Sequence, residues 1–341
     1  MAVKIAINGF GRIGRLVLRS IIESNRTDVV PVTINDLSDI KESAYLLKYD
    51  TMHGRFPGEV TIQGDSILIK ANGRTYDPIK VTTEQDPTKL PYKGIDVAME
   101  CTGHFKKREK AALLLEAGAR KVLISAPASD SDATIVYGVN HQTITKDMTI
   151  VSNASCTTNC LAPIAMVLEE NYGIEAGYML TAHSYTGDQR TVDTVHKDAR
   201  RGRAAAQNII PTSTGAARAV GLVLPQLKGK LDGAAVRVPT ANVSFVSFDC
   251  ILKKVPGSVE EINEYFKKAT SSGPLKGVMA YNEDDTVSSD FNHYEFYSSV
   301  FDATQTSLVN GGKIVRVAGW YDNEWGFSTR MSDTAKVMGE F

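Results

Sequence analysis

The feature that most constrains the fold is a glycine-rich run near the start of the chain, Gly9-Phe10-Gly11-Arg12-Ile13-Gly14. It directly follows a β-rich stretch at residues 3–8 and opens a stretch at 13–24 whose apolar residues recur at helical spacing, with a further strand-like stretch at 29–34. A strand, a helix and a strand of these lengths form a parallel pair joined by a right-handed crossover. The chain is therefore expected to begin with a doubly wound α/β domain.

A second block of the chain repeats this alternation of strands and helices. Between the blocks, residues 58–81 read as short antiparallel strands interrupted by the turn signals Gly64-Asp65 and Asn72-Gly73. The second block is predicted to comprise a strand at 96–100, a helix at 106–117 and strands at 121–125, 135–138 and 149–151. Together the blocks predict an N-terminal, Rossmann-type domain with a mainly parallel sheet.

The pattern changes in the second half of the chain, where long strands alternate with helices, which favours an α+β domain with a mainly antiparallel sheet. A chain of 341 residues also exceeds the size at which one core usually stops growing. We expect a first domain over 1–155, completed by a C-terminal helix over 323–341, and a second domain over 156–322. The strands predicted for the second domain are 177–184, 234–238, 243–252 and 314–321, and a helix is predicted at 259–269.

The glycine run in this context is typical of dinucleotide binding. Gly9 permits a tight turn, Gly11 lets the backbone approach a pyrophosphate and Gly14 lets the helix pack closely on the strand. The helix N-terminus, with Arg12 and Ile13, would face the phosphates. Asp36 lies about 20 residues further on, at the end of the second strand, where a carboxylate binds ribose hydroxyls and repels a 2′-phosphate. These residues predict NAD, with a plain cluster of turn glycines as the alternative.

Charge and cysteine content narrow the class of protein. The formal net charge of -1 provides no field that would attract nucleic acid or an anionic membrane, so neither is an expected partner. The four cysteines have neither the number of a disulfide framework nor the spacing of a zinc site, so no metal is predicted and a reducing, cytoplasmic location is expected. Small neutral or anionic ligands are more compatible with the near-zero net charge than nucleic acid or a membrane surface.

Cys156 stands at the expected start of a helix that runs through residue 168. Free backbone N–H groups and the positive end of the helix macrodipole favour a thiolate there. A buried, unreactive thiol is the alternative, because most free cysteines behave as small apolar residues. A polar, arginine-rich stretch of low periodicity follows at 184–207, and loops of that length are usually functional or held by a partner.

With these features assembled, the whole chain resembles the phosphorylating, glycolytic glyceraldehyde-3-phosphate dehydrogenases. The Ala154-Ser155-Cys156-Thr157-Thr158-Asn159 run carries most of this resemblance. Further matches in the same order are the glycine run, Pro211-Thr212-Ser213-Thr214-Gly215-Ala216-Ala217, Arg237-Val238-Pro239-Thr240 and Trp320-Tyr321-Asp322-Asn323-Glu324.

The resemblance implies a catalytic and oligomerisation role for the second domain. Cys156 would be the nucleophile and His183 its base, in the oxidation of glyceraldehyde 3-phosphate to the acyl phosphate 1,3-bisphosphoglycerate, with reduction of NAD and a thioester intermediate. On sequence alone His183 is one of six histidines, and a lone strand histidine is more often structural. The long loop would line a neighbouring subunit's cofactor pocket, which implies a homotetramer.

The remaining site residues also come from the resemblance. It assigns Thr186 and Arg237 to the substrate phosphate, and Asn323 and Ser125 to the cofactor. The incoming phosphate would be held by hydroxyls and backbone N–H groups, with a guanidinium nearby. That second group comprises Ser155, Thr157, Thr214, Gly215 and Arg201.

The sequence departs from the family pattern at three places, and three other functions are compatible with parts of it. Thr194-Val195 stands where many NAD-using relatives carry a residue followed by proline, which keeps NADP open; Gln85 replaces a basic residue and Phe327 a tyrosine. The nearest rival activity is erythrose-4-phosphate dehydrogenase, although Asp36 and the intact run from Ser213 argue against it. A non-catalytic NAD-binding redox sensor and a cysteine hydrolase are the others, and the hydrolase would leave the glycine run unused.

Overall fold

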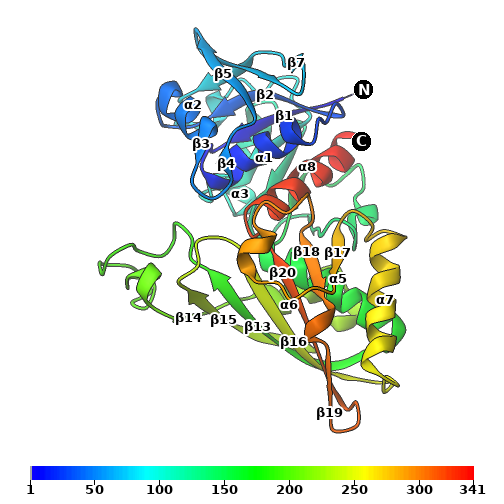
Figure 1. The fold of residues 1–341 in the computed structure, drawn as a ribbon. Helices are drawn as coiled ribbons and strands as arrows, with labels where there is room; N and C mark the ends of the chain where they lie inside the picture. Colours follow the sequence, from blue (N-terminus) through cyan, green and yellow to red (C-terminus); the bar gives the residue numbers. More distant parts are fainter. Residues whose placement is uncertain (1) are drawn as a thin grey trace. The chain divides into compact units, whose positions relative to one another are not determined.

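The structure is a computed structural model that describes residues 2–341. The described chain groups into two compact units (Figure 1). The first contains the residues up to Ser155 together with Ser328–Phe341, and the second contains Cys156–Phe327. Each unit has its own sheet.

The first unit is built on a sheet whose core is parallel. Its strand order is β11-β12-β10-β9-β1-β2-β8-β6-β5, with β7 paired to β6, and every pair from β11 to β8 is parallel. The strands are β1 (Val3–Asn8), β2 (Val29–Asn35), β5 (Gly58–Gln63), β6 (Ser66–Ala71), β7 (Arg74–Thr75), β8 (Ile79–Thr82), β9 (Val97–Glu100), β10 (Lys121–Ile124), β11 (Ala133–Thr134) and β12 (Ile150–Ser152).

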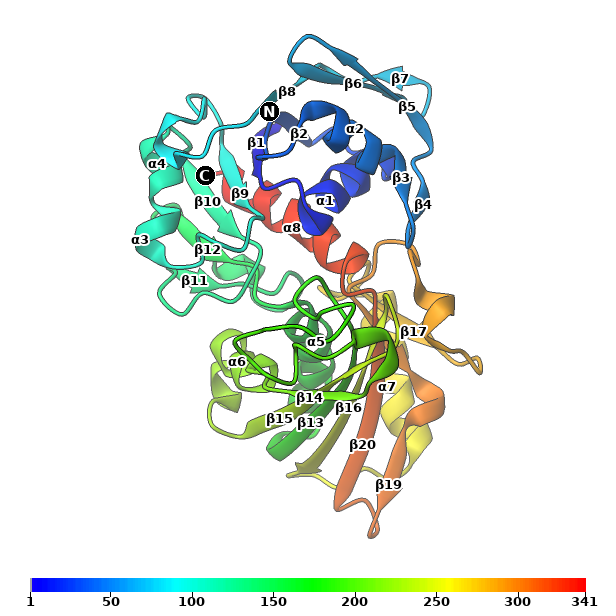
Figure 2. The same ribbon diagram turned by 90° about the vertical axis from the view of Figure 1, so that its left-hand side faces the viewer.

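Helices cover both faces of this parallel core, which is why β1, β9 and β10 consist of almost continuous apolar runs. Figure 2 shows α3 and α4 on one side of the strands and α1 and α8 on the other. Ala98 of β9 and Val122 of β10 pack in one core cluster with Ala111 of α3 and Leu114 of α4. The helices of this unit are α1 (Arg12–Glu23), α2 (Ile40–Lys48), α3 (Arg108–Ala111), α4 (Leu113–Glu116) and most of α8 (Trp325–Gly339).

Three details differ from the sequence prediction. The strand expected at 135–138 does not form: the edge strand that pairs with β12 is β11 (Ala133–Thr134), and residues 137–140 form a turn. The segment expected to be wholly antiparallel ends in β8, which pairs parallel to β2 and antiparallel to β6, so it joins the parallel core to the β5–β7 extension. The helix predicted at 106–117 is divided into α3 and α4. Ala112, between them, keeps helical angles (φ -60°, ψ -24°), so the path of the chain stays helical while the hydrogen-bond ladder is interrupted.

The second unit is a mainly antiparallel sheet covered on one face by helices. The order is β14-β15-β13-β16-β20-β18-β17, with β19 paired to β20 and with β13–β15 and β17–β18 as the parallel pairs. The strands are β13 (Ile174–Ser184), β14 (Ile210–Thr212), β15 (Leu231–Val238), β16 (Ser244–Leu252), β17 (Met279–Asn282), β18 (Ser299–Asp302), β19 (Ser307–Val309) and β20 (Ile314–Tyr321); a separate pair in the first unit is β3 (Tyr49–Asp50) and β4 (Gly54–Arg55).

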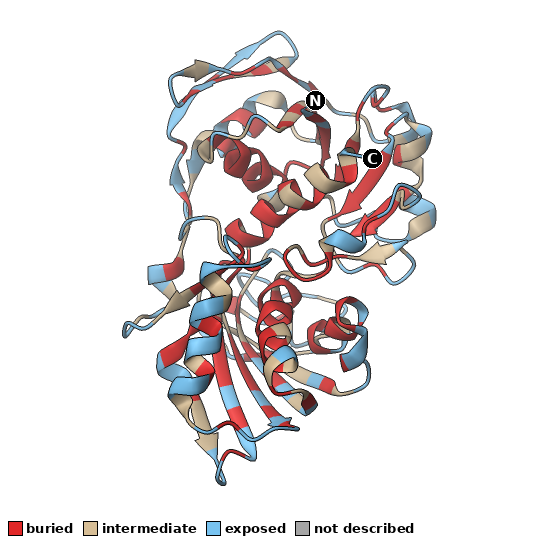
Figure 3. Ribbon diagram, turned by 90° about the vertical axis from the view of Figure 1, so that its right-hand side faces the viewer, coloured by how far each residue is buried: buried red, intermediate tan, exposed pale blue. Residues whose placement is uncertain are grey.

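The helices α5 (Cys156–Asn171), α6 (Ala216–Val223) and α7 (Val259–Ser271) contact the same sheet. Residues 178–183 of β13 and 248–252 of β16 alternate between buried and more exposed side chains. Figure 3 shows buried and exposed residues mixed along the strands of this sheet. Tyr178, Leu180 and Ile251 are exposed because they point away from these helices. The predicted fold class, a Rossmann-type domain followed by an α+β domain with a mainly antiparallel sheet, is confirmed.

Across residues 2–341, no helix combines the length and the apolar character that crossing a bilayer requires.

Candidate functional site

A cavity of about 380 Å³ lies in the first unit, at the carboxyl ends of β1, β2 and β9. This is the edge at which doubly wound sheets bind their ligands. The cavity is lined by Asn8, Gly9, Gly11, Asn35, Asp36, Leu37, Glu84, Gln85, Pro87, Cys101, Thr102, His104 and Phe105.

The three fingerprint glycines meet different surroundings. A Cβ on Gly14 would lie 2.0 Å from the carbonyl oxygen of Gly9, so the helix cannot approach the turn unless this residue is glycine. Gly9 has φ +94°, and a Cβ there would lie 2.6 Å from the backbone nitrogen of Thr102. No atom lies within 4 Å of a Cβ on Gly11. That open space at the start of α1 suits the approach of a ligand's phosphates to the backbone, so the residues present fit a dinucleotide.

Asp36 is fixed by the backbone of the glycine run. Its Oδ2 accepts a hydrogen bond from Phe10 N at 2.7 Å, and its Oδ1 accepts from Ser38 N and Ser38 Oγ. Burial opposes ionisation of this carboxyl, but these hydrogen bonds outweigh it and lower its pKa. An ionised carboxylate therefore lines the cavity next to Leu37, as binding of ribose hydroxyls requires.

Arg12 and Ile13 begin α1, and the Arg12 guanidinium donates to Asp50 at 2.5 and 3.2 Å. Burial disfavours the charged form of Asp50, yet Arg12 and the backbone of residues 52 and 53 bring its pKa down to about 2. The side chain of Arg12 thus connects the start of α1 to β3, the short strand that follows α2. Ser125 lies at the end of β10, where its backbone nitrogen donates to the carbonyl of Glu100.

The second unit contains the thiol and the histidine. Cys156 is the first residue of α5 and His183 is the next-to-last residue of β13; Cys156 Sγ lies 3.5 Å from His183 Nε2. The predicted helix therefore begins where expected and extends three residues further than residue 168, to Asn171. His183 is buried, whereas Cys156 keeps partial exposure.

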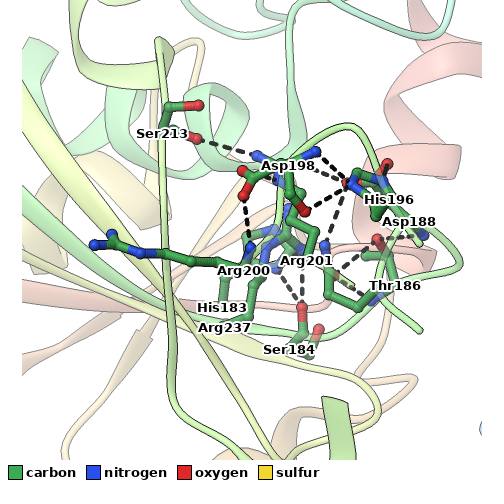
Figure 4. Close-up of polar contacts among 11 residues, drawn as sticks. His183, Ser184, Thr186, Asp188, His196, Asp198, Arg200, Arg201, Ser213 and Arg237 are labelled. Carbon is green, nitrogen blue, oxygen red and sulfur yellow. Dashed lines mark hydrogen bonds and ion pairs between the residues drawn. The ribbon is translucent and has the colours of Figure 1, made fainter. Parts of the chain in front are cut away.

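Sheet register places Arg237 beside His183, because β13 and β15 pair in parallel with His183 opposite Arg237. Arg237 Nη1 lies 2.9 Å from His183 Nδ1 and 2.9 Å from the carbonyl oxygen of Ser184, while Nδ1 lies 2.7 Å from the same carbonyl (Figure 4). Nδ1 faces both an acceptor and a donor. The ring can thus hold its proton on Nδ1, leaving Nε2 to accept one, or on Nε2, donating to a thiolate.

Burial and Arg237 set the charges of this pair. Burial, followed by the Arg237 guanidinium, lowers the pKa of His183 to about 3. Burial raises the pKa of the Cys156 thiol, while Arg237 and the backbone N–H groups at the start of α5 oppose the rise. The helix end predicted to favour a thiolate is therefore present, but desolvation outweighs it. The contact with His183 offers the thiol proton a direct acceptor.

Tyr321 supports this arrangement and had no role in the sequence prediction. Its hydroxyl lies 2.9 Å from Thr157 Oγ1 and 2.9 Å from Thr181 Oγ1, so it connects α5 to β13. Its ring meets the His183 ring edge to face at 5.8 Å. A tyrosine two residues before Asn323 gives no sequence signal for this contact, because the three segments meet only in the folded sheet.

The predicted phosphate residues lie on the loops of the second unit. Thr186 is held by Gln189, whose Oε1 accepts from Thr186 N at 3.0 Å. Arg201 lies between two carboxylates: it donates to Asp188 and forms an ion pair with Asp198 at 3.3 Å (Figure 4). Arg201 Nη2 also reaches the carbonyl of Ser213 at 3.5 Å. Asp188 was missed by sequence reasoning, which considered this segment only as a polar loop.

Thr214 and Gly215 precede α6, with Thr214 Oγ1 accepting from Ala216 N at 3.2 Å. Thr158 Oγ1, in the first turn of α5, donates to the carbonyl of Ala216 at 3.4 Å. The two helices therefore begin close together in the same unit, with their backbone N–H groups near Thr157 and Gly215. Such paired helix N-termini favour an anion.

Asn323 Oδ1 accepts hydrogen bonds from Ser184 Oγ at 2.7 Å and Ser244 Oγ at 2.9 Å. These contacts orient the amide so that Nδ2 can donate to a ligand.

The predicted site residues are divided between the two units, with one group in the first unit and the other in the second. The first group is Gly9, Gly11, Arg12, Ile13, Gly14, Asp36, Ser125 and Ser155; the second is Cys156, Thr157, His183, Thr186, Arg201, Thr214, Gly215, Arg237 and Asn323.

Further polar residues of the cavity were not predicted. Asn8, Asn35 and Thr102 line it, and Glu100 lies at the end of β9 beside them. A carboxylate that ends an apolar strand and is followed by Cys-Thr-Gly is the sequence signal that could have indicated Glu100. Within residues 2–341, no group of three or more His, Cys, Asp or Glu side chains could hold a metal ion.

Comparisons with known proteins agree with these observations. Residues 3–108 match the family model "Glyceraldehyde 3-phosphate dehydrogenase, NAD binding domain", and residues 155–323 match "Glyceraldehyde 3-phosphate dehydrogenase, C-terminal domain".

Curated relatives named glyceraldehyde-3-phosphate dehydrogenase match along the whole chain. The Xanthobacter flavus protein is 57% identical over 100% of this chain and 99% of its own length. The Cereibacter sphaeroides protein is 56% identical over 99% of each, and the Geobacillus stearothermophilus protein is 52% identical over 99% of this chain and 98% of its own. The predicted resemblance and the predicted cofactor, NAD, are confirmed. The chain belongs to the glyceraldehyde-3-phosphate dehydrogenase family.

Proposed function

We propose that this chain oxidises D-glyceraldehyde 3-phosphate with NAD and inorganic phosphate, using Cys156 as the nucleophile and His183 as the base. The observation that carries the proposal is the 3.5 Å contact between Cys156 Sγ and His183 Nε2 at the start of α5. A nucleophile within reach of a base, which is itself oriented by a third group, is the arrangement that covalent catalysis requires.

In the first step, Cys156 sulfur adds to the aldehyde carbon and its proton passes to His183. The carbonyl oxygen becomes an oxyanion and then the hydroxyl of a hemithioacetal. We assign the backbone N–H of Cys156 and the imidazole as the donors to this oxygen. The helix N-terminus supports the negative charge, and donors of this kind contribute about 3 kcal/mol each to transition-state stability.

In the second step, His183 accepts the hemithioacetal hydroxyl proton while the carbon loses its hydride. NAD, when bound, supplies the hydride acceptor. The product is a thioester on Cys156. The lowered pKa of His183 keeps the imidazole neutral near pH 7, so it is ready to accept the proton.

In the third step, phosphate oxygen attacks the thioester carbon and Cys156 leaves as a thiolate, which gives the acyl phosphate. We assign Thr186 and Arg237 to the substrate phosphate. The start of α5 and α6 is assigned to the incoming phosphate, because helix N-termini and hydroxyls bind this anion. That second set comprises Ser155, Thr157, Thr214 and Gly215, with Arg201 nearby.

For the cofactor, we assign the backbone of Gly9, Gly11, Arg12, Ile13 and Gly14 to the pyrophosphate. Asp36 would bind the adenosine ribose, Ser125 would contact a ribose or phosphate, and Asn323 would donate to the nicotinamide carboxamide. The two serine hydroxyls on Asn323 Oδ1 support this role, because they orient the amide for donation. Asp36 also favours NAD over NADP.

The remaining assignments concern the whole protein. We propose an NAD-binding domain over 1–155, completed by residues 323–341, and a catalytic and oligomerisation domain over 156–322. We also propose a cytoplasmic homotetramer. The apolar side chains of Tyr178, Leu180 and Ile251, exposed on one face of the second sheet, support self-association. Light scattering coupled to size-exclusion chromatography tests this, and a monomer at micromolar concentration would refute it.

The activity is tested by following NADH absorbance with glyceraldehyde 3-phosphate, with and without phosphate, and again with NADP. We expect turnover that requires phosphate and prefers NAD. Faster oxidation of erythrose 4-phosphate would favour the sister activity instead. NAD binding without turnover of either aldehyde would favour a redox sensor.

A further inference from the structure

Glu100 is a buried carboxylate to which the proposed reaction gives no role. It ends β9, and its relative exposure is 1%. In the part of the chain that the structure describes, no lysine, arginine or histidine forms an ion pair with it. Burying an unpaired carboxylate is costly unless hydrogen bonds replace its lost water. The partners of those hydrogen bonds show which segments the buried carboxylate holds together.

The carboxylate joins the end of β1 to the loop after β9. Its Oε2 accepts from Asn8 Nδ2 at 2.7 Å. Its Oε1 accepts from Thr102 N at 2.9 Å, from Gly103 N at 3.1 Å and from Thr102 Oγ1. Four donors from two segments thus converge on one side chain.

The network continues across the carboxyl edge of the sheet. Asn8 Oδ1 accepts from Asn35 Nδ2 at 2.9 Å, and Asn35 Oδ1 accepts from Thr82 Oγ1 at 2.8 Å and Glu84 N at 2.9 Å. These residues end β9, β1, β2 and β8, which are successive neighbours in the sheet. Four of the residues in the network, Asn8, Asn35, Glu84 and Thr102, also line the 380 Å³ cavity.

The same loop packs directly on the glycine run. A Cβ on Gly9 would lie 2.6 Å from Thr102 N and 2.8 Å from the carbonyl carbon of Cys101, so the two backbones are in close contact. A displacement of residues 101–103 would therefore move the turn that contains Gly9. Glu100 is the side chain that hydrogen-bonds to both the strand before this turn and the loop against it.

We propose that Glu100 is a positioning residue for NAD, whose ionised carboxylate holds the glycine run and residues 101–103 in the binding geometry. It acts on the cofactor through Asn8 and Thr102, which line the cavity. No chemical step passes through it. The inference rests on NAD as the cofactor and is independent of the catalytic roles proposed for Cys156 and His183.

The charge state of Glu100 should then appear in the affinity for NAD. Only the ionised form can accept from all four donors, because a protonated carboxyl places a fifth hydrogen among them. Burial raises the pKa of Glu100, opposed by the hydrogen bonds from Thr102, Asn8 and Gly103. The titratable groups facing it are Tyr92 and Cys101, and burial raises the pKa of both, so they stay neutral near pH 7. Affinity is therefore lost as pH falls, at a higher pH than an ordinary glutamate would give.

The test is calorimetric titration of the full chain with NAD, from about pH 8 to about pH 5, on the wild type, Glu100→Gln and Tyr92→Phe. Glutamine keeps the size of the side chain but turns one acceptor into a donor that opposes Asn8. Tyr92→Phe is the matched control, because the Tyr92 hydroxyl is buried, lies near Glu100 and has no hydrogen-bond partner among the described residues.

We expect Glu100→Gln to raise the Kd for NAD about tenfold at pH 7, and to remove the weakening that the wild type shows as pH falls. Tyr92→Phe should match the wild type at every pH. At saturating NAD, kcat for any aldehyde that is turned over should remain within about twofold of the wild type. A wild-type Kd with a wild-type pH profile in Glu100→Gln would overturn the proposal, and so would a loss confined to kcat.

Thr102→Val covers the case in which Glu100→Gln fails to fold. This change removes the half-buried hydroxyl that donates to Glu100 and accepts from His104 N at 3.0 Å. The backbone N–H groups of Thr102 and Gly103 still donate to Glu100, so the melting temperature should stay close to the wild type. We expect a Kd about threefold higher. Wild-type affinity in a folded Thr102→Val protein would contradict the proposal. Because calorimetry needs no aldehyde turnover, failure of the proposed activity would leave this test intact.

Discussion

At the scale of single residues, Cys156 is governed by two opposing influences. Burial favours the neutral thiol, whereas the α5 N-terminus and the Arg237 cation favour the thiolate. The same cation and the same burial keep His183 neutral. The positive charge of Arg237 thus favours loss of the proton from the Cys156 sulfur and lowers the affinity of the His183 imidazole for that proton. A group that accepts a proton and then releases it needs both effects.

Arg237→Leu should therefore slow alkylation of Cys156 at pH 7 about tenfold, the effect of one unit of thiol pKa. The pKa of the thiol rises because the nearby positive charge is lost. Iodoacetamide labelling followed by mass spectrometry of the Cys156 peptide measures the rate. Arg218→Leu, which removes an exposed arginine paired with Asp232 in the same unit, should leave it unchanged. Equal rates in Arg237→Leu and the wild type would show that Arg237 does not tune the thiol.

Asp50→Asn should lower the free energy of unfolding at pH 7 by about 1–2 kcal/mol, discounted because Arg12 is partly exposed. The folded-state pKa of Asp50 is about 2, below its unfolded value of 3.8. The stability it contributes is therefore complete above about pH 4 and is lost as pH falls through about 2. Urea unfolding at pH 7 and at about pH 3 measures the change.

The control is Asp65→Asn. Asp65 is exposed, and its Oδ2 lies as far as 3.8 Å from Lys80 Nζ, so this ion pair is weak. The effect of this change should stay within about 0.5 kcal/mol. A destabilisation by Asp50→Asn that is the same at both pH values would argue against the ion pair as its origin.

At the scale of elements, the β1–α1 turn shows how much the sequence could predict. The strand, the helix and the roles of Gly11 and Gly14 follow from spacing, because local turn geometry and helix packing impose them. The second reason for glycine at position 9, the approach of residues 101–102, could not be predicted. It depends on a contact between segments more than 90 residues apart in the chain, and periodicity reports only local pattern.

Gly11→Ala and Gly14→Ala should separate binding from folding. At Gly14 a methyl group would lie 2.0 Å from a backbone oxygen, so we expect a marked fall in melting temperature. At Gly11 no atom lies within 4 Å, so the variant should melt like the wild type while binding NAD at least tenfold more weakly. Differential scanning fluorimetry and calorimetric titration measure the two effects. Tight NAD binding by Gly11→Ala would mean that the cofactor does not approach this residue.

For the two residues proposed as catalytic, the sequence again predicted part of the arrangement and the fold supplied the rest. The sequence pattern located Cys156 at a helix start, but His183 stood out from five other histidines only through family resemblance. What singles it out in the structure is the register of β13 against β15, which sets it beside Arg237, and the contact with Cys156. The carboxylates on Arg201 escaped prediction for a related reason: within an irregular loop, sequence spacing says nothing about which charges meet.

At the scale of the whole molecule, the residues assigned to one reaction belong to two compact units. The first carries the cavity proposed for NAD, and the second begins at Cys156 and carries His183 and Arg237. The order of strands and helices in each unit could be predicted, since both sheets have strong apolar patterns. The chemistry depends on loops and strand ends, where polar residues from distant segments meet.

The most direct test of the central claim is intact-protein and peptide mass spectrometry after mixing the enzyme with NAD and glyceraldehyde 3-phosphate without added phosphate. We predict an acyl adduct on the Cys156 peptide, which disappears when phosphate is added, and none in Cys156→Ser, which should still bind NAD. Formation of NADH without an adduct on Cys156, or with an adduct that phosphate does not release, would contradict the account.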